Sequence, residues 1–366
     1  MESYILGPDL LYALLYGGVM MLSIVGCIYL LFRRGNAFAS DVTSPVRLRR
    51  WAAALLAVMA LGHVWWMFVP PSPEEEYTMG TMICAGLDCV VLVTTMMATL
   101  LAMLQDRRRS IVPILIAMVP VVSAVAVYAF SPEDVVLTLL RIYIIGLDIV
   151  FTIFMIFAVR QYSRWLRDNY ADLEHKEVRK SLLALTVFML VFVFYGVSPD
   201  KLAVQYLVQV SAVLVICLLL WRVETIQQLG DAGQPAPHRK TSGPETEGAR
   251  TVPSDTGALL EQHCEQAQLY LQHDLTLTQL SEAIGVGTTA LSMYFAQQGK
   301  TYHDYINGLR IRHFIRLYQE SLAAGRSVTA KQLAFESGYR SYSTFGTVFK
   351  QSMGQPVTAW MRELAE

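Results

Sequence analysis

Four ionisable residues interrupt long apolar runs of this 366-residue chain, namely His63, Asp88, Arg141 and Asp148. Ionisable side chains inside a membrane span are rare, and they mark a functional site or a structural pair. Arg141 and Asp148 are seven residues apart, so they share one face of a helix. The functional interpretation is an outward-opening polar site that binds a ligand or senses protons. The alternative is an Asp88–Arg141 ion pair and satisfied polar packing between helices.

A second group of side chains lies near the C-terminus, in two stretches that each follow a glycine. The group consists of Thr288, Thr289, Ser292 and Met293, then Arg340, Ser341, Tyr342, Ser343, Thr344, Thr347 and Lys350. Hydroxyl groups can bond phosphates or base edges, whereas Arg340 alone can grip guanine with two hydrogen bonds. Lys350 suits a phosphate contact. The group predicts a DNA-contacting surface, and the alternative for each member is an ordinary exposed helix residue.

The elements that hold these side chains repeat one pattern. Residues 280–286 and 333–339 each form a short apolar helix with a glycine turn, followed by a second helix with apolar residues at helical spacing. This is the layout of a helix-turn-helix, whose second helix reads the DNA major groove. The intervening residues 302–322 form one helix of about 30 Å, close to the roughly 34 Å between successive major-groove faces. One chain can therefore place two reading helices on one side of a duplex.

Other residues of this region receive simpler interpretations. Arg310, Arg312 and Arg316 on the connecting helix are expected to be solvated or salt-bridged. A core is predicted for the apolar residues Leu280, Ile284, Leu291, Phe295, Leu333, Phe345 and Phe349.

Residues from about 256 to 364 resemble the double helix-turn-helix domain of AraC/XylS-type transcription regulators. The motifs are 280–286, Leu291-Ser292 with Phe295, Tyr305 to Leu309-Arg310, Leu333-Ala334 with Gly338-Tyr339, Phe345 with Phe349-Lys350, and Gly354. The resemblance covers under a third of the chain and implies an all-helical domain that binds DNA. Met293 and Thr347 stand where the family usually has arginines, and Gly287 stands where a serine would cap the first reading helix.

Composition places much of the remaining chain in lipid. Hydrophobic residues make up 54% and charged residues only 16%, whereas soluble domains are about a quarter charged. Apolar runs occur at about 10–32, 51–69, 79–104, 111–130, 135–159, 181–197 and 201–221. Most of them reach the ~20 residues that span a bilayer. The predicted fold is all-α, a polytopic seven-helix transmembrane bundle followed by the double helix-turn-helix domain, as in membrane-bound AraC-like regulators of bacteria.

The loops between the runs predict the orientation. Arginines follow the first, third and fifth runs, whereas Glu74–Glu76 and Glu133-Asp134 lie in alternate loops. Because cytoplasmic loops carry excess Lys and Arg, the N-terminus is expected outside and the C-terminus inside. The predicted location is the bacterial inner membrane, multi-pass, with the DNA-binding domain in the cytoplasm.

These features divide the chain into a transmembrane domain at 1–229, a linker at 230–253 and a DNA-binding domain at 254–366. The linker is rich in Gly, Pro, Ser and Thr, which is typical of a flexible tether with a mean reach of roughly 27 Å. Such a tether cannot pass a small rigid rotation, but it can pair two DNA-binding domains if the membrane parts dimerise.

The sequence thus predicts a membrane-tethered, sequence-specific transcription regulator that senses a signal through its transmembrane domain. Expected partners are double-stranded DNA, membrane lipids, a second copy in a homodimer, and an unknown small-molecule or envelope signal. The alternative is a membrane receptor or transporter-like protein whose degenerate helix-turn-helix domain docks protein partners. Met293, Thr347 and a near-neutral C-terminal region favour it, since residues 255–366 hold nine Lys and Arg against ten Asp and Glu.

Nothing in the sequence supports catalysis, a cofactor or a metal site. It has no Gly-rich phosphate loop, no Gly-x-Ser-x-Gly and no His-Glu-x-x-His. The five cysteines have neither metal-ligand nor disulfide-framework spacing. The protein is therefore not expected to be an enzyme.

Overall fold

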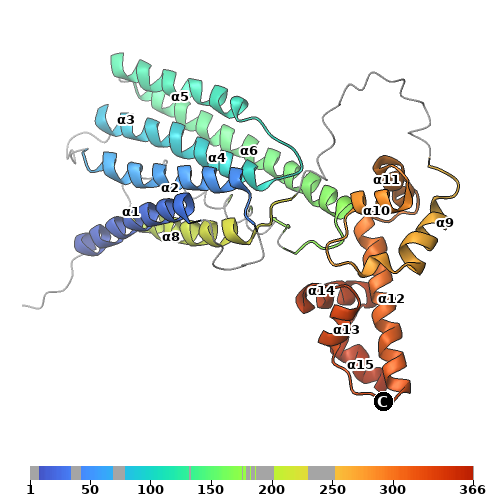
Figure 1. The fold of residues 1–366 in the computed structure, drawn as a ribbon. Helices are drawn as coiled ribbons and strands as arrows, with labels where there is room; N and C mark the ends of the chain where they lie inside the picture. The colour runs from blue at the N-terminus through green and yellow to red at the C-terminus, as the bar shows by residue number, and fades with distance from the viewer. Residues whose placement is uncertain are drawn as a thin grey trace, which may run out of the picture. The chain divides into compact units, whose positions relative to one another are not determined.

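The computed structural model describes residues 8–33, 43–68, 79–131, 133–174, 176–178, 182, 186, 202–229 and 252–365. These residues are mostly helical and contain no strand, only an isolated bridge between Tyr170 and Thr276. The all-helical prediction is confirmed for this part of the chain. Two compact units form, one from Met1–Tyr162 with Val178–Leu229, the other from Ser163–Glu177 with Gly230–Glu366 (Figure 1).

The first unit is a bundle of long helices. In order they are α1 (Pro8–Phe32), α2 (Val46–Trp66), α3 (Met79–Leu87), a π-helical turn (Asp88–Leu92), α4 (Val93–Met103), α5 (Val112–Phe130), α6 (Asp134–Asn169) and α8 (Leu202–Thr225). Helix α2 packs against α1, α4 and α8 and forms much of the bundle interior. Helices suit this apolar region because they satisfy all backbone polar groups internally, as lipid requires.

Among the described residues, five helical stretches are long and apolar enough to cross a membrane: Leu10–Phe32, Met79–Met103, Val112–Phe130, Asp134–Asn169 and Ala203–Thr225. The predicted span at 51–69 falls on α2, which is not among the five. Arginines at 47, 49 and 50 begin α2 and His63 lies in its last turn, so its apolar centre is short. The predicted span at 181–197 lies outside the described residues, apart from 182 and 186. The structure therefore supports five of the seven predicted spans.

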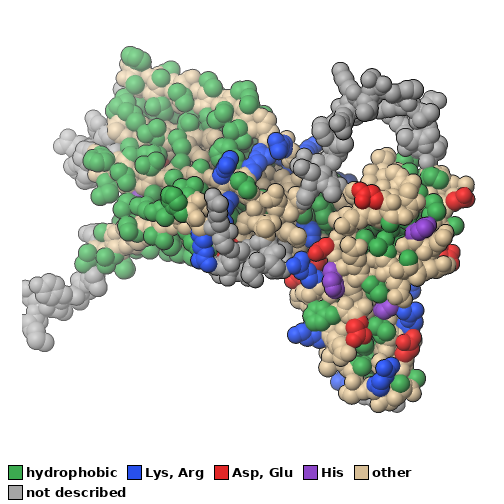
Figure 2. All heavy atoms as spheres, viewed as in Figure 1, with side chains coloured by type: hydrophobic (Ala, Val, Ile, Leu, Met, Phe, Trp, Pro, Cys, Tyr) green, Lys and Arg blue, Asp and Glu red, His purple; other side chains and the backbone are tan. Residues whose placement is uncertain are grey.

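The surface of the first unit is apolar. Large hydrophobic side chains are exposed along α1, α5 and α6, among them Leu14, Ile116, Val150 and Phe157. Figure 2 shows hydrophobic side chains over most of this unit. Contiguous exposed apolar surface on this scale is unusual for a soluble protein, so the bundle is suited to a membrane.

Polar contacts distinguish the two ends of this bundle. At one end Arg47 donates to the Arg109 carbonyl at 2.8 Å, and Gln105 donates to the Gln227 carbonyl at 3.0 Å. This end joins the start of α2 with the ends of α4 and α8. At the opposite end, where α1 and α8 begin, the Tyr12 ring lies 5.5 Å from the Tyr206 ring. Helices α1 and α8 are therefore parallel, as the first and last spans of an odd-numbered bundle are.

The second unit contains the predicted pair of helix-turn-helix motifs. Its helices are α9 (Thr256–Leu260), α10 (Leu277–Ile284), α11 (Thr288–Gln297), α12 (Tyr302–Ala323), α13 (Ala330–Glu336), α14 (Tyr342–Met353) and α15 (Val357–Ala365). Separate apolar cores form around the two ends of α12. All seven predicted core residues are buried, which confirms them: Leu280, Ile284, Leu291, Phe295, Leu333, Phe345 and Phe349.

One segment of the predicted transmembrane domain folds with the DNA-binding part. Ser163–Glu177 lies within the stretch assigned to 1–229 by sequence, yet it belongs to the second unit. Helix α6 enters this segment without a break and, with 36 residues, is about 54 Å long. That length exceeds the ~30 Å of a bilayer core. The predicted linker at 230–253 lies outside the described residues except for its last two positions.

Candidate nucleic-acid interface

The first helix-turn-helix begins with a capped helix and ends in a turn that needs glycine. Thr276 caps α10 by accepting from the Gln279 backbone NH, and Gln279 accepts from the Thr276 NH in return. Gly285 follows α10 at φ 70°, a left-handed conformation that glycine adopts without strain. Ser281 closes the turn by donating to the Val286 carbonyl at 2.6 Å. The start of α11 is thereby fixed relative to α10.

Helix α11 turns its predicted DNA residues outward. Thr288 and Thr289 are exposed, Ser292 is half-buried, and Met293 is 39% exposed. The opposite face, with Leu291 and Phe295, is buried in the first core. Gly287 occupies the N-cap and makes no side-chain cap bond, as expected from its sequence position.

The second helix-turn-helix repeats this construction with a longer turn whose glycine is closely packed. Thr329 caps α13 by accepting from the Gln332 NH. Gly338 has φ 87°, and a Cβ there would lie 2.8 Å from the Leu271 backbone. No larger residue fits without moving that backbone. Tyr339 is buried directly after it, with its ring 5.2 Å from Phe345.

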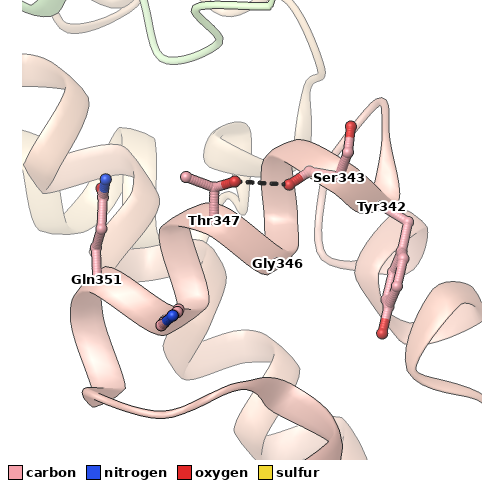
Figure 3. Close-up of a pocket in the computed structure, with 6 residues that line it drawn as sticks. Tyr342, Ser343, Gly346, Thr347 and Gln351 are labelled. Atoms are coloured by element: carbon pink, nitrogen blue, oxygen red, sulfur yellow. Dashed lines mark hydrogen bonds between the residues drawn. The ribbon is translucent and has the colours of Figure 1, made fainter.

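Helix α14 presents a polar stripe that borders a shallow hollow. Ser343, Thr347 and Lys350 are exposed, and Tyr342 is half-buried. These four side chains line the hollow with Gly346 and Gln351 (Figure 3). Thr347 donates to the Ser343 carbonyl at 3.0 Å, so its hydroxyl is oriented by its own helix.

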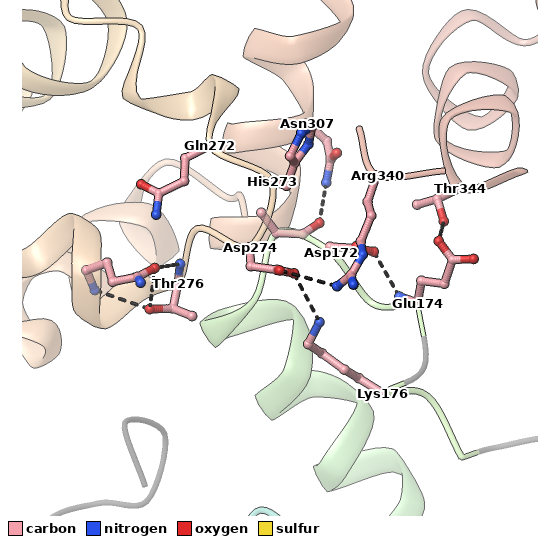
Figure 4. Close-up of polar contacts among 12 residues, drawn as sticks. Asp172, Glu174, Lys176, Gln272, His273, Asp274, Thr276, Asn307, Arg340 and Thr344 are labelled. Carbon is pink, nitrogen blue, oxygen red and sulfur yellow. Dashed lines mark hydrogen bonds and ion pairs between the residues drawn. The ribbon is translucent and has the colours of Figure 1, made fainter. Parts of the chain in front are cut away.

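Side chains of the predicted set around the start of α14 have partners within the protein. Ser341 is the N-cap of α14 and accepts from the Thr344 NH at 3.2 Å. Thr344 donates its hydroxyl to Glu174 at 2.9 Å, and Arg340 lies 3.3 Å from the Asp274 carboxylate (Figure 4). Sequence reasoning missed both acidic partners because they lie 170 and 66 residues away along the chain. No local pattern could have indicated them.

Arg310 is not the surface residue expected from sequence. It is 1% exposed, and it donates to the carbonyls of Tyr270, Gln272 and His273 at 2.8, 2.7 and 3.3 Å. Its guanidinium lies 5.5 Å from the centre of the Tyr339 ring. Burial lowers its pKa. Arg310 therefore links the loop before α10 to the turn of the second motif.

The interface region carries mixed charge. Figure 2 shows acidic and basic side chains interspersed over the second unit. The Arg316 side chain lies 3.8 Å from Glu320 on the same helix, and both are more than half exposed. Such a surface pair contributes at most about 1 kcal/mol. Among the exposed cations, Lys350 lies on α14, Arg340 directly precedes its N-cap, and Lys300 follows the end of α11.

The intramembrane candidates lie on three elements of the bundle, namely α2, the π-helical turn and α6. His63 Nε2 is 3.1 Å from Gln209, and its Nδ1 is 2.7 Å from the Met59 carbonyl. Asp88, at the π-helical turn, accepts from the Trp66 indole at 2.6 Å. Asp88 of the bundle thus has a polar partner on α2, the Trp66 indole.

The other two candidates, Arg141 and Asp148, share α6. Asp148 is buried, and one of its carboxylate oxygens has no hydrogen-bond partner in the described part of the chain. The described residues contain no group of three His, Cys, Asp or Glu side chains placed to hold a metal ion.

Comparison with known families gives one match. Residues 280–363 match the family described as a helix-turn-helix domain. Neither the curated proteins nor the solved structures gave a match. The matched range runs from α10 to α15 and contains both reading helices. The match supports a DNA-binding helix-turn-helix domain in this part of the chain.

Proposed function

We propose that this protein is a membrane-embedded transcription regulator of the bacterial inner membrane, whose C-terminal domain binds specific DNA sites from the cytoplasm. The observation that carries the proposal is the pair of reading helices, α11 and α14, each with an exposed polar face. They are joined by the 22-residue helix α12, which is about 33 Å long. That length suits successive major-groove faces on one side of a duplex.

Exposed hydroxyl groups within this surface would bond phosphates or base edges. They belong to Thr288, Thr289, Ser343 and Thr347. Lys350 is the phosphate-contacting cation. Ser292 and Met293 would complete the contact at α11, and Ser341, Tyr342 and Thr344 would flank it at the start of α14. Arg340 would grip guanine after exchanging Asp274 for the base.

The signal enters through the apolar helices. Candidate sensing residues are His63, Asp88, Arg141 and Asp148. Binding of a small-molecule or envelope signal, or a change in the surrounding lipid, would shift the population of a DNA-competent homodimer. A dimer also offsets the weak basicity of the domain, because two linked domains bind one site with higher avidity.

A second candidate function follows from the exposed Met293. An apolar side chain on the outer face of α11, together with Thr347 on α14, suits a protein partner better than phosphates. In that case the domain would dock a protein, and the membrane part would act as a receptor or transporter-like module.

Binding of the full chain in lipid nanodiscs to a labelled duplex of about 30 base pairs, three helical turns, separates the two functions. The regulator should lose about tenfold or more in affinity between 50 and 200 mM salt, from a slope of about −0.9 per phosphate contact. Lys350→Ala should weaken binding and reduce that slope by about one. The control is Arg326→Ala, which removes an exposed charge from the turn after α12 and should change neither. Absence of salt-sensitive binding would favour the docking function.

A further inference from the structure

We call residues 168–176 the covering segment. It begins in the last turn of α6 and crosses the helix-turn-helix domain. The segment contacts each of the three helices that form the DNA-binding surface. It contains Asp168, Asp172 and Glu174 but only one described cation, Lys176. Its backbone bridges to the start of α10 through Tyr170 and Thr276.

The strongest contact is with the second reading helix. Thr344 of α14 donates its hydroxyl to the Glu174 carboxylate at 2.9 Å. The loop that carries Glu174 is shaped by Asp172, which accepts from the Glu174 NH at 2.9 Å. Lys176 is buried and lies 4.0 Å from Asp274, the same carboxylate that pairs with Arg340 (Figure 4). Two predicted DNA contacts, Thr344 and Arg340, are therefore engaged at this end of the segment.

The other end of the segment reaches the first reading helix. Asp168 lines one hollow with Thr289, Ser292 and Met293 of α11. Between the two ends, the Ala171 carbonyl accepts from Asn307 of α12 at 2.9 Å, and Ala171 is buried in the first core. The segment thus runs from α11 across α12 to α14.

Carboxylates in these positions disfavour the binding of DNA. Asp168 and Glu174 stand beside hydroxyls that would contact phosphates, so a bound duplex would meet both steric overlap and like-charge repulsion. We propose that the covering segment and DNA occupy the same face of the helix-turn-helix domain in mutual exclusion, so that the structure represents a DNA-free, self-covered state. This inference rests on the proposed function.

The position of the covering segment in the chain links the exclusion of DNA to a membrane helix. Helix α6 carries Arg141 and Asp148 in its apolar part and ends at Asn169, inside the covering segment. A membrane span is therefore covalently continuous with the cover, without the 230–253 linker between them. Displacement of the end of α6 would disturb these contacts and thereby expose or cover the reading helices.

The test compares two charge-neutralising variants, one within the covering segment and one directly after it. Glu174→Gln removes the charged acceptor of Thr344, whereas Glu177→Gln removes an exposed carboxylate that has no side-chain partner among the described residues. Both variants lose one negative charge, so they share any general gain in attraction to DNA. Duplex binding is measured by fluorescence anisotropy with the full chain in nanodiscs at constant salt.

Glu174→Gln should bind the duplex several-fold and up to about tenfold more tightly than wild type, the size expected when the Thr344 hydroxyl donates to a neutral amide oxygen in place of a carboxylate. Glu177→Gln should differ from wild type by less than about twofold, as for an exposed charge outside any contact. Equal affinities for the two variants would overturn the inference while leaving the proposed function intact. Lack of duplex binding by wild type and by both variants would overturn the proposed function and this inference with it.

A second measurement detects the contact between the covering segment and α14 directly. Glu174→Cys combined with Thr344→Cys should be joined by a short bis-maleimide in the absence of DNA. Saturating duplex should reduce the yield of this crosslink, which mass spectrometry quantifies. A yield unchanged by duplex that is shown to be bound would contradict mutual exclusion.

Discussion

Replacement of Arg310 by methionine tests how the two helix-turn-helix motifs are held together. Methionine keeps much of the side-chain volume but removes every donated hydrogen bond. Three carbonyls, those of Tyr270, Gln272 and His273, lose a charged donor, and the face of the Tyr339 ring loses its cation.

The magnitude follows from these contacts. A hydrogen bond to a charged group contributes about 1.5–3 kcal/mol, and a cation over an aromatic ring contributes about 0.5–2 kcal/mol. Removal of the buried charge offsets part of this loss of stability, because burial of a guanidinium itself costs free energy. We therefore expect Arg310→Met to lower the free energy of unfolding of the C-terminal unit by about 3–5 kcal/mol, as for other broken buried networks.

Hydrogen exchange of the full chain in nanodiscs measures this change, since peptides from residues 256–365 report the C-terminal unit separately. A loss of 3–5 kcal/mol accelerates the slowest amides by about two to four orders of magnitude. The control is Arg312→Met on the same helix, where the arginine is exposed and the expected loss is below about 0.5 kcal/mol. Equal exchange in the two variants would refute the structural role assigned to Arg310.

Three further predictions concern the same unit. Burial lowers the pKa of His303 and His313. Because the unfolded state then binds more protons, the stability of the unit should fall as pH drops below about 6.5. Replacement of both histidines by glutamine should reduce this pH dependence, as measured by thermal unfolding. Gly338→Ala should destabilise the unit severely because of its close contacts and positive φ, whereas Gly346→Ala, which meets open space, should be neutral or stabilising by up to about 1 kcal/mol. Thr301→Ala removes the capping box of α12 and should cost about 1 kcal/mol in denaturant unfolding.

Local patterns predicted the C-terminal unit well. The glycines at 285 and 338 and the apolar spacing around them indicate both helix-turn-helix motifs, because turns and amphipathic faces depend on neighbouring residues. The core at Leu291, Phe295, Phe345 and Phe349 follows from the same spacing, and the structure confirms it. The polar faces of α11 and α14 are a consequence of that core.

Contacts between distant segments were beyond this reasoning. Arg310 resembles any helix-surface arginine in sequence, and only the approach of Tyr270 and Tyr339 buries it. The hydrogen bond from the Trp66 indole to Asp88 depends on the packing of α2 and was not anticipated from the sequence. The contact between Glu174 and Thr344 joins residues of the two predicted domains. Each depends on tertiary packing that periodicity does not encode.

The central claim, that an intact membrane-embedded chain binds specific DNA sites, is tested most directly by genome-wide DNA occupancy in the native host. Full-length chain from the membrane fraction is compared with a Thr347→Ala, Lys350→Ala variant, whose substitutions lie on the exposed stripe of α14. We predict discrete sites that disappear in the variant while the protein remains at the membrane. The absence of sites, or identical occupancy by the variant, would contradict the claim.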